Sequence, residues 1–242
     1  MKLAPAMGAI LIEAENLARR YGRRWALADV SFQVRSGSVV MVAGRNGSGK
    51  STLFRLLSTA IRPDRGTATI GGFQLVRERE DIRRMAAILS HYSYLYESLT
   101  ARENLAVAAD HLGKSRSAIM PLLERVALAS RADDPVSTFS AGMRKRVSFA
   151  RVLLQEPQLA LLDEPYGQLD PEGFALVDEV VRELKASGTT VMMATHQIER
   201  GSGLADDAIL LDAGRVTWTG PAAGILTRER RRDQSAQRGA AC

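Results

Sequence analysis

The chain contains few residues of several types, and each of these absences excludes some classes of protein. Cysteine occurs once, as Cys242, so no intramolecular disulfide can form and a reducing cytosol is expected. Aromatic residues make up only 5% of the chain. No run approaches the roughly 20 apolar residues of a membrane span. Residues 1–15 lack the apolar run of a secretion signal. These absences predict a globular protein that does not cross a membrane by itself.

Lysine is also scarce, since 28 of the 33 basic residues are arginine. The net charge is +6, with basic clusters at residues 19–24, 144–146 and 228–232. Such clusters could meet nucleic acid or anionic lipid. Because no interleaved aromatics and no nucleic-acid motif accompany them, we interpret them as solvent-exposed faces and expect no nucleic-acid partner.

What the sequence does contain is one glycine-rich segment with a recognisable pattern. Residues 44–52 read GRNGSGKST, which fits G-x-x-x-x-G-K-[ST]. The valine-rich run at 38–43 predicts a buried strand, and residues 52–59 predict the opening turns of a helix. Strand, glycine loop and helix form the context that this phosphate-binding motif requires. The alternative, a plain glycine turn before a helix, does not explain the lysine.

The residue types of this segment suit an ATP phosphate group. Glycines let successive N–H groups turn toward a phosphate, and the helix N-terminus adds partial positive charge. Lys50 can reach the β- and γ-phosphates, and the Ser51 hydroxyl can ligate Mg²⁺. The predicted nucleotide-binding residues here are Gly44, Asn46, Gly47, Ser48, Gly49, Lys50, Ser51 and Thr52.

A second motif supplies two adjacent carboxylates. Residues 159–165 read LALLDEP, an apolar strand that ends in Asp163 and Glu164. Ligands bind at the carboxyl edge of such sheets. There Asp163 would hold Mg²⁺ through water, and Glu164 would polarise the attacking water. Read alone, the motif could also be a strand end with two solvated acids.

Strands and helices alternate along most of the chain, but residues 101–155 have helical spacing only. This pattern predicts an α/β domain with a helical insertion. Within a single domain of residues 1–242, we expect a nucleotide-binding core at 9–100 and 156–226, a helical subdomain at 101–155 and a disordered basic tail at 227–242. The predicted strands are Ile10–Glu13, Val30–Val34, Val39–Ala43, Thr67–Ile70, Met85–Leu89, Leu159–Leu162, Thr190–Ala194, Ala208–Leu211 and Val216–Thr219, with a helix at Glu172–Ala186.

From about residue 9 to residue 226, the ordered motifs resemble the nucleotide-binding subunits of ATP-binding-cassette (ABC) transporters. In that family a signature of the type L-S-G-G-Q opens a helix before the carboxylate strand. Residues 139–143 read FSAGM, in which Ser140 and Gly142 match positions that contact the γ-phosphate held by the other subunit. Ala141 and Met143 depart from the pattern, and a plain helix N-cap is the alternative for Ser140. The resemblance implies a P-loop ATPase fold of the ABC type, with a mixed sheet core, an antiparallel β region and a helical subdomain.

Further positions can be matched one by one. Asp170 resembles the aspartate of the D-loop, which crosses the dimer interface. His196 follows an apolar strand and resembles the H-switch histidine, which bonds the γ-phosphate. Tyr21 resembles the aromatic residue that stacks on adenine, and Trp25 is a weaker candidate. Ordinary packing is the alternative role for either aromatic residue.

One position departs from the family pattern. Where the family normally has a glutamine that touches metal and water, ahead of an L-T-x-x-E-N-L element, this chain has His91. A neutral histidine could ligate or hydrogen-bond there. Either His91 binds at the nucleotide, or coupling to the membrane subunit differs.

The resemblance implies an ATPase that uses ATP and Mg²⁺. It implies a head-to-tail pair, of two copies or of this chain with a homologue, in which each site takes Lys50, Glu164 and His196 from one subunit and Ser140 from the other. Its partners would be membrane permease subunits, so the chain would be peripheral at the cytoplasmic face of the inner membrane. A degenerate non-hydrolysing module is disfavoured because the catalytic positions are present.

The stretch Ser90–Leu105 looks most like the haem-exporter ATPase of cytochrome c maturation, and haem export is therefore one expectation. The alternative is the ATPase subunit of another ABC exporter, for drugs, lipids or polysaccharides. A soluble ABC protein of DNA repair would need a long coiled coil. A soluble translation-type ABC protein would need two cassettes. Neither feature occurs in the sequence.

Overall fold

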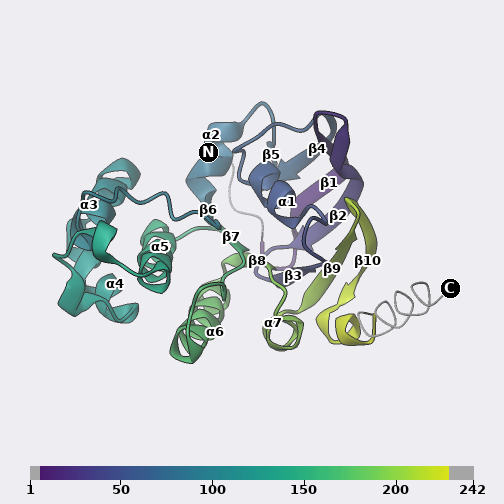
Figure 1. Ribbon diagram of the computed structural model, residues 1–242. Helices are drawn as coiled ribbons and strands as arrows, with labels where there is room; N and C mark the ends of the chain where they lie inside the picture. Colours follow the sequence, from purple (N-terminus) through teal and green to yellow (C-terminus); the bar gives the residue numbers. More distant parts are fainter. Residues whose placement is uncertain (1–5, 229–242) are drawn as a thin grey trace.

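The structure, a computed structural model, describes residues 6–228, which form two β-sheets and the helices that pack on them (Figure 1). One sheet is antiparallel, and its strands are β1 (Ile10–Tyr21), β2 (Arg24–Arg35), β4 (Arg65–Ile70) and β5 (Phe73–Gln74), in the order β2-β1-β4-β5. The other is mixed, and its strands are β3 (Val39–Ala43), β6 (Ala86–Leu89), β7 (Leu159–Asp163), β8 (Thr190–Ala194), β9 (Asp207–Asp212) and β10 (Arg215–Pro221), in the order β10-β9-β3-β8-β7-β6.

The mixed sheet places several strand ends at one edge. Its strands run parallel except for β10, which pairs antiparallel with β9. Every residue of β3, β7 and β8 is buried, because both faces of this sheet are covered, one by helices and the other by α1 and the antiparallel sheet. The carboxyl ends of these three strands, at Ala43, Asp163 and Ala194, therefore lie next to one another.

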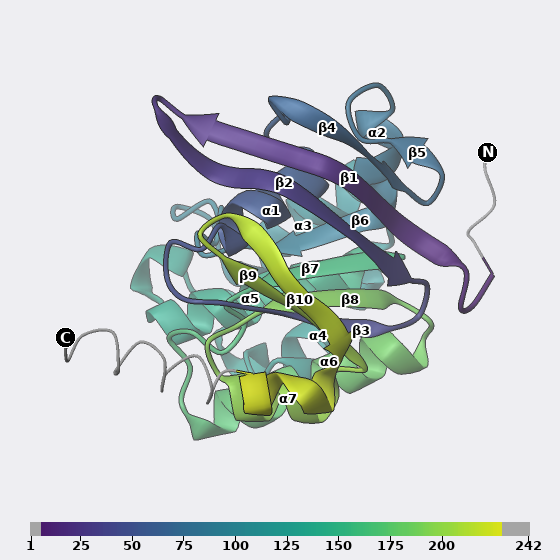
Figure 2. The ribbon, with the colours of Figure 1, turned by 90° about the vertical axis from the view of Figure 1, so that its right-hand side faces the viewer.

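The antiparallel sheet covers one face of the mixed sheet. Figure 2 shows β1 and β2 as a long two-stranded ribbon that crosses over the other strands. Helix α1 (Lys50–Leu57) lies in between, and its buried side chains Leu53 and Phe54 belong to the same hydrophobic cluster as Leu17 of β1 and Val42 of β3. The antiparallel sheet thus holds the start of α1 against the carboxyl edge of the mixed sheet.

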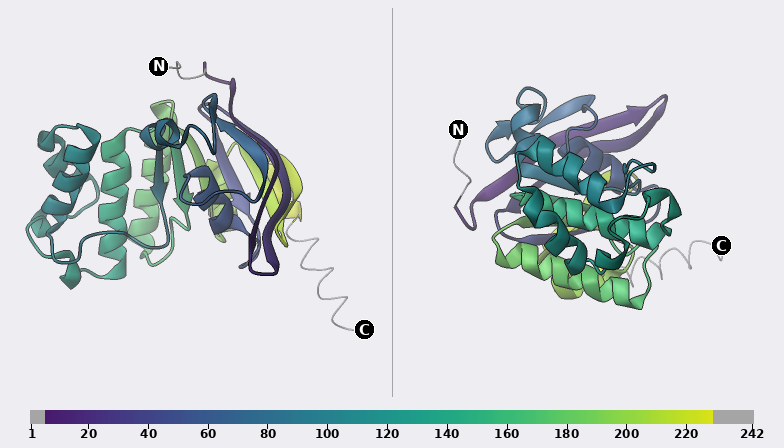
Figure 3. Two further views of the ribbon diagram at one scale, coloured as in Figure 1. Left: turned by 90° about the horizontal axis from the view of Figure 1, so that it is seen from above. Right: turned by 90° about the vertical axis from the view of Figure 1, so that its left-hand side faces the viewer.

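The opposite face of the mixed sheet is packed by α5 (Ala141–Gln155) and α6 (Pro171–Ala186). Helices α3 (Ala101–Leu112) and α4 (Ile119–Arg125) pack against α5, on the side of the molecule away from the antiparallel sheet (Figure 3). The other helical segments of residues 6–228 are α2 (Arg79–Met85), α7 (Ile198–Leu204), residues 225–228 and short 3₁₀ turns at Arg116–Ala118, Ala129–Arg131, Val136–Thr138 and Ala222–Gly224.

The predicted fold class is confirmed, with a mixed sheet, an antiparallel sheet and a group of helices. The prediction was wrong at Met85, which ends α2 instead of opening a strand. The division into core and helical subdomain remains our proposal. The prediction of a disordered tail is wrong at residues 227 and 228, which are helical, and residues 229–242 lie outside the described residues. Within residues 6–228, every helix is too short or too polar to span a bilayer.

Candidate active site

The segment between β3 and α1 is a loop that only glycine can build at two positions. Gly44 has φ 149° and Gly49 has φ 109°, in the region that L side chains rarely adopt. A Cβ on Gly44 would lie 2.2 Å from the carbonyl oxygen of Leu211. A Cβ on Gly49 would lie 2.5 Å from that of Ala26. The loop is therefore wedged against β9 and β2, which fixes where its N–H groups sit.

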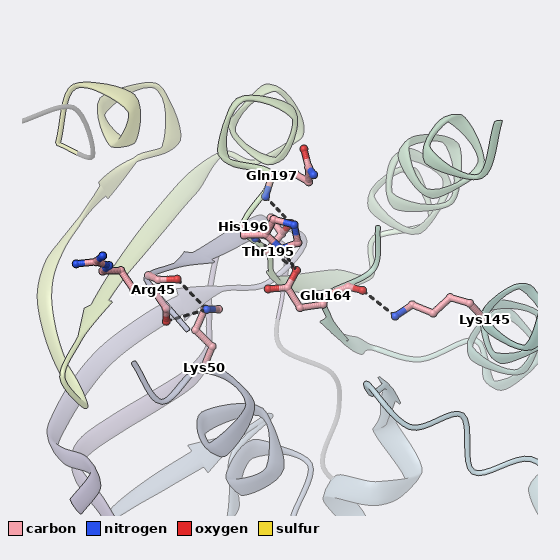
Figure 4. A network of polar contacts seen from close by, with 8 residues as sticks. Arg45, Lys50, Lys145, Glu164, Thr195, His196 and Gln197 are labelled. Atoms are coloured by element: carbon pink, nitrogen blue, oxygen red, sulfur yellow. Dashed lines mark hydrogen bonds and ion pairs between the residues drawn. The ribbon is translucent and has the colours of Figure 1, made fainter. Parts of the chain in front are cut away.

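Lys50 opens α1 and folds back over this loop. Its Nζ donates hydrogen bonds to the carbonyl oxygens of Gly44, at 2.8 Å, and Arg45, at 3.2 Å (Figure 4). The side chain is only 6% exposed. Gly49 at the N-cap position supplies no side-chain acceptor, so the first N–H groups of α1 are left for another acceptor. A helix N-terminus with a buried cation beside it suits a phosphate group.

A cleft of about 540 Å³ opens beside this loop. That volume is in the range of small-molecule sites. Its walls bring together residues from the β1–β2 hairpin, the loop, the start of α1 and the end of β7. They are Tyr21, Arg24, Ala26, Asn46, Gly47, Gly49, Lys50, Ser51, Thr52 and Glu164.

Of the two aromatic candidates, the structure brings Tyr21 to this cleft. Trp25 lies elsewhere, with the guanidinium groups of Arg20 and Arg65 5.9 and 5.4 Å from its ring. Ser48, within the loop, is buried, and its Oγ has no hydrogen-bond partner among residues 6–228. A buried hydroxyl without a partner points to an acceptor or donor that binds from outside the chain.

Asp163 ends β7 beside the cleft and is 5% exposed. Burial raises the pKa of its carboxyl group, and a hydrogen bond from Ser51 opposes that effect. The Oδ1 atom of Asp163 is buried and makes no hydrogen bond within the described part of the chain. A carboxylate oxygen without a partner, next to a serine hydroxyl, suits Mg²⁺.

The described residues 6–228 contain no group of three metal-binding side chains. Phosphate oxygens and waters would therefore complete the coordination of such an ion.

Glu164 and His196 come from neighbouring strand ends and meet directly. Glu164 Oε2 lies 2.8 Å from His196 Nδ1 and 3.4 Å from the His196 backbone nitrogen (Figure 4). The Glu164 N–H donates to the carbonyl oxygen of Ala194 at 2.8 Å, which ties the end of β7 to that of β8. A carboxylate held by a histidine at the mouth of the cleft can accept a proton from water.

Ser140, Gly142 and Asp170 lie together, but in a second cavity of about 530 Å³. Ser140 is the N-cap residue of α5, because its Oγ accepts a hydrogen bond from the Met143 N–H at 3.2 Å. Asp170 caps α6 through Gly173 N at 2.8 Å, and this bond holds the pKa of Asp170 below its ordinary value. The other lining residues of this cavity are Ala127, Leu128, Arg131, Ala141, Met143, Arg146, Gln168 and Leu169.

The structure does not bring His91 to the cleft. It is exposed in the loop after β6, where its ring meets Tyr92 edge-on at 5.4 Å. It lines a third cavity, of about 240 Å³, together with Lys145 and Gln168. A direct contact of His91 with the phosphate loop is therefore not part of this arrangement.

Sequence reasoning missed two basic residues near the site. Arg24 lines the cleft, and Lys145 reaches the Glu164 backbone. The interpretation of residues 144–146 as a solvent-exposed face is wrong at Lys145, which is 6% exposed. Lys145 precedes Phe149 by four residues and Val152 by seven, so helical spacing could have indicated that it is buried, although not what it contacts.

Known proteins match this chain along most of its length. The family model described as ABC transporter matches residues 27–167. The daunorubicin resistance ATP-binding protein DrrA3 of Streptomyces coeruleorubidus is 40% identical over 220 residues, which are 89% of this chain and 70% of that protein. The Nod factor export ATP-binding protein I of Ralstonia nicotianae is 34% identical over 230 residues, covering 93% and 72%. The lantibiotic transport ATP-binding protein SrtF of Streptococcus pyogenes is 33% identical over 206 residues, covering 85% and 89%.

Solved structures agree with the sequence matches. The ATP binding subunit of an ABC transporter superposes with a TM-score of 0.82 at 32% identity, over 90% of this chain and 92% of that one. A dimeric bacterial ABC transporter cassette gives a TM-score of 0.81 at 25% identity, over 87% and 98%. The relatives above are named for drug resistance, Nod factor export and lantibiotic transport. They do not support the haem-export expectation and instead favour its alternative, the ATPase of another exporter.

Proposed function

Because this chain belongs to the ABC transporter family and is one of its transport ATPases, we propose that it is the subunit that energises a membrane exporter. The observation that carries the proposal is the meeting of three strand ends at one edge. Lys50 follows β3, Glu164 follows β7 and His196 follows β8. The cleft thus has a cation and a carboxylate in its lining, with a histidine in contact with the carboxylate, which suits phosphoryl transfer.

The nucleotide would lie with its phosphates on the loop from Gly44 to Thr52 and its adenine against Tyr21. This orientation follows from the cleft, which has the tyrosine at one wall and Lys50 at another. Lys50 would exchange its two carbonyl partners for phosphate oxygens. Asn46, Gly47 and Ser48 would contribute loop donors.

Ser51 and Asp163 would hold Mg²⁺ between them and the phosphates. The observation that supports this assignment is the buried Oδ1 of Asp163, which has no hydrogen-bond partner among the residues that the structure describes. When bound, the ion neutralises charge on the β- and γ-phosphates. A cation here would also offset the effect of burial on the pKa of Asp163.

Glu164 would act as the general base and His196 as the residue that orients it. Their 2.8 Å contact keeps the carboxylate beside the cleft. In a loaded site His196 would also reach the γ-phosphate. General-base catalysis contributes about 10²–10⁴-fold to a rate, so Glu164 is the residue whose loss should matter most for turnover.

The second cavity is best explained as the other half of a shared site. Ser140 and Gly142 lie at the N-terminus of the 15-residue helix α5, where N–H groups and the helix dipole favour an anion. Since they line a different cavity from Lys50, they would serve a nucleotide held by another subunit. Asp170 would lie at that interface. Two cassettes packed head to tail would complete two such sites.

For the cargo, we propose an antibiotic-like or amphipathic compound rather than haem. The support is the 40% identity with a daunorubicin resistance protein and the export names of the other relatives.

The permease would dock on the loop of residues 90–99. Tyr92, Tyr94 and Tyr96 of this loop are 71%, 71% and 60% exposed. His91 would then act in coupling rather than in nucleotide binding.

The experiment is Mg²⁺-dependent ATP hydrolysis by the purified chain, compared with Lys50→Ala. Wild type should release phosphate only with Mg²⁺, and the variant should lose nucleotide binding or turnover. Lys185→Ala is the matched control, because that lysine pairs with Asp206 at the surface. Unchanged hydrolysis in Lys50→Ala would refute the phosphate-loop assignment.

A further inference from the structure

Lys145 is a buried cation outside the nucleotide cleft. Its side chain is 6% exposed, on α5. Lysine is almost never this buried unless its ammonium group has a partner, because removing the charge from water is costly. The partner is a backbone atom: Nζ donates to the carbonyl oxygen of Glu164 at 2.7 Å (Figure 4).

The accepting residue has an unusual backbone conformation. Glu164 has φ 49°, in the left-handed region that non-glycine residues seldom occupy. Such a conformation persists only when its surroundings hold it. Three backbone contacts do so: the Glu164 N–H donates to Ala194, and its carbonyl oxygen accepts from Gly167 N at 3.1 Å and from Lys145.

Charged groups around Lys145 also connect it to Glu164. Burial lowers the pKa of its ammonium group, while the carboxylates of Asp163 and Glu164 act in the opposite direction. An ammonium group beside two carboxylates offsets their mutual repulsion. Lys145 therefore acts on the Glu164 backbone through a hydrogen bond and on both carboxylates through charge.

Lys145 also belongs to the helix that carries the second half-site. Ser140 caps α5, and Lys145 lies in the second turn of that helix. A helix is stiff over so short a distance. A displacement of the N-terminus of α5 would therefore be transmitted to Glu164 through the Lys145 side chain.

We propose that Lys145 is a positioning residue that holds Glu164 in its strained conformation and links it to the helix that meets the second nucleotide. This inference rests on the proposed function, since Glu164 must be the base for its position to matter. Lys145 itself touches no nucleotide in this arrangement. Its loss should lower the rate of hydrolysis without weakening ATP binding.

The test compares Lys145→Met, which removes the donor at similar length, with Lys145→Arg, which keeps a charged donor. We expect Lys145→Met to lower kcat by about 10- to 100-fold, as small misplacements of catalytic groups do, with KM for ATP nearly unchanged. Lys145→Arg should keep most of the activity. Lys114→Met, which removes a surface pair with Glu156, is the control and should match wild type.

A second readout separates positioning from damage to α5. In a Glu164→Gln background, Lys145→Met should still form dimers with ATP, measured by size-exclusion chromatography. Loss of that dimer would show that Lys145 merely supports the second half-site, and would overturn the proposal. If Lys145→Met does not fold, Lys145→Gln replaces it, since it keeps the site polar but is too short for the contact. The same loss of kcat is expected there.

Different results would refute the proposed function and the role of Lys145. If wild type does not hydrolyse ATP, the proposed function fails. If Glu164→Gln hydrolyses ATP normally, the base is another group, and Lys145 has no base to position. If both behave as expected but Lys145→Met has the kcat of wild type, only the role of Lys145 is refuted.

Discussion

Replacing Glu164 with glutamine removes the carboxylate that we assign as general base and leaves the phosphate loop intact. The side chain is 21% exposed, and its Oε2 lies 2.8 Å from His196 Nδ1. Glutamine has the same shape and can still hydrogen-bond to His196. It cannot take a proton from water, so the chemical step should suffer while nucleotide binding should not.

The size of the effect follows from the role. A general base is worth about 10²–10⁴-fold in rate, which is about 2.7–5.4 kcal/mol of activation free energy at 1.36 kcal/mol per factor of ten. We therefore expect kcat to fall at least about 100-fold. The affinity for ATP should change little, because Lys50 and the glycine loop make their contacts without Glu164.

The assay is phosphate release under saturating MgATP, paired with a binding measurement using a fluorescent ATP analogue. Glu172→Gln is the control, because Glu172 is an exposed acid in the first turn of α6. A folded Glu164→Gln protein that hydrolyses ATP at near the wild-type rate would show that the base is another group. Weakened ATP binding in that variant would show that Glu164 supports the loop instead.

Three further outcomes are expected. Tyr166→Phe removes a buried hydroxyl that donates to Asp178 at 2.8 Å, so urea unfolding should show a loss of about 1.5–3 kcal/mol, whereas exposed Tyr92→Phe should show none. Tyr21→Ala should raise KM for ATP about two- to twelvefold, since an aromatic contact is worth about 0.5–1.5 kcal/mol; an unchanged KM would reject Tyr21 as the adenine contact. The hydrogen bond from the Gly173 N–H holds the pKa of Asp170 below 3.8. The ionised Asp170 carboxylate therefore contributes its full stabilisation above pH 3.8, and this stabilisation disappears as the pH falls below that value. Asp170→Asn, which can still cap α6, should therefore lose less stability than wild type between about pH 5 and about pH 2, and an equal loss would contradict this reasoning.

The strands that were predicted best are those buried on both faces. Val39–Ala43 and Thr190–Ala194 have the bounds expected from their apolar runs. β1 and β2 were predicted too short, although the missed part of β1 contains the buried Ala14 and Leu17. Register shifts on both sides of Leu17 break the two-residue alternation there, and the hairpin ends at Tyr21 and Arg24 are exposed. A periodic pattern is lost at such irregularities and at ends that pairing rather than burial holds.

α2 and β5 were missed for a related reason. α2 has only two buried residues, Ile82 and Met85, in a charged sequence, and β5 is two residues long. Their positions depend on packing against distant segments, which local periodicity does not record.

The residues of the cleft were predictable where a motif fixes their spacing. Lys50 and Glu164 lie around one cleft, and His196 touches Glu164. Lys145 could not be assigned from the sequence, because its contact is with a backbone atom of another element. Nor could the sequence separate Tyr21 from Trp25, since the choice depends on which ring lines the cleft in the folded chain.

The central claim is that ATP at this site drives a membrane exporter, and ATP-dependent capture tests it most directly. A tagged Glu164→Gln chain would be expressed in its native cell and purified from detergent-solubilised membranes with and without ATP. We expect a stoichiometric permease of the drug or peptide export type, retained with ATP and reduced when Lys50→Ala is added. Recovery of soluble complexes alone, with no integral membrane protein, would contradict the account.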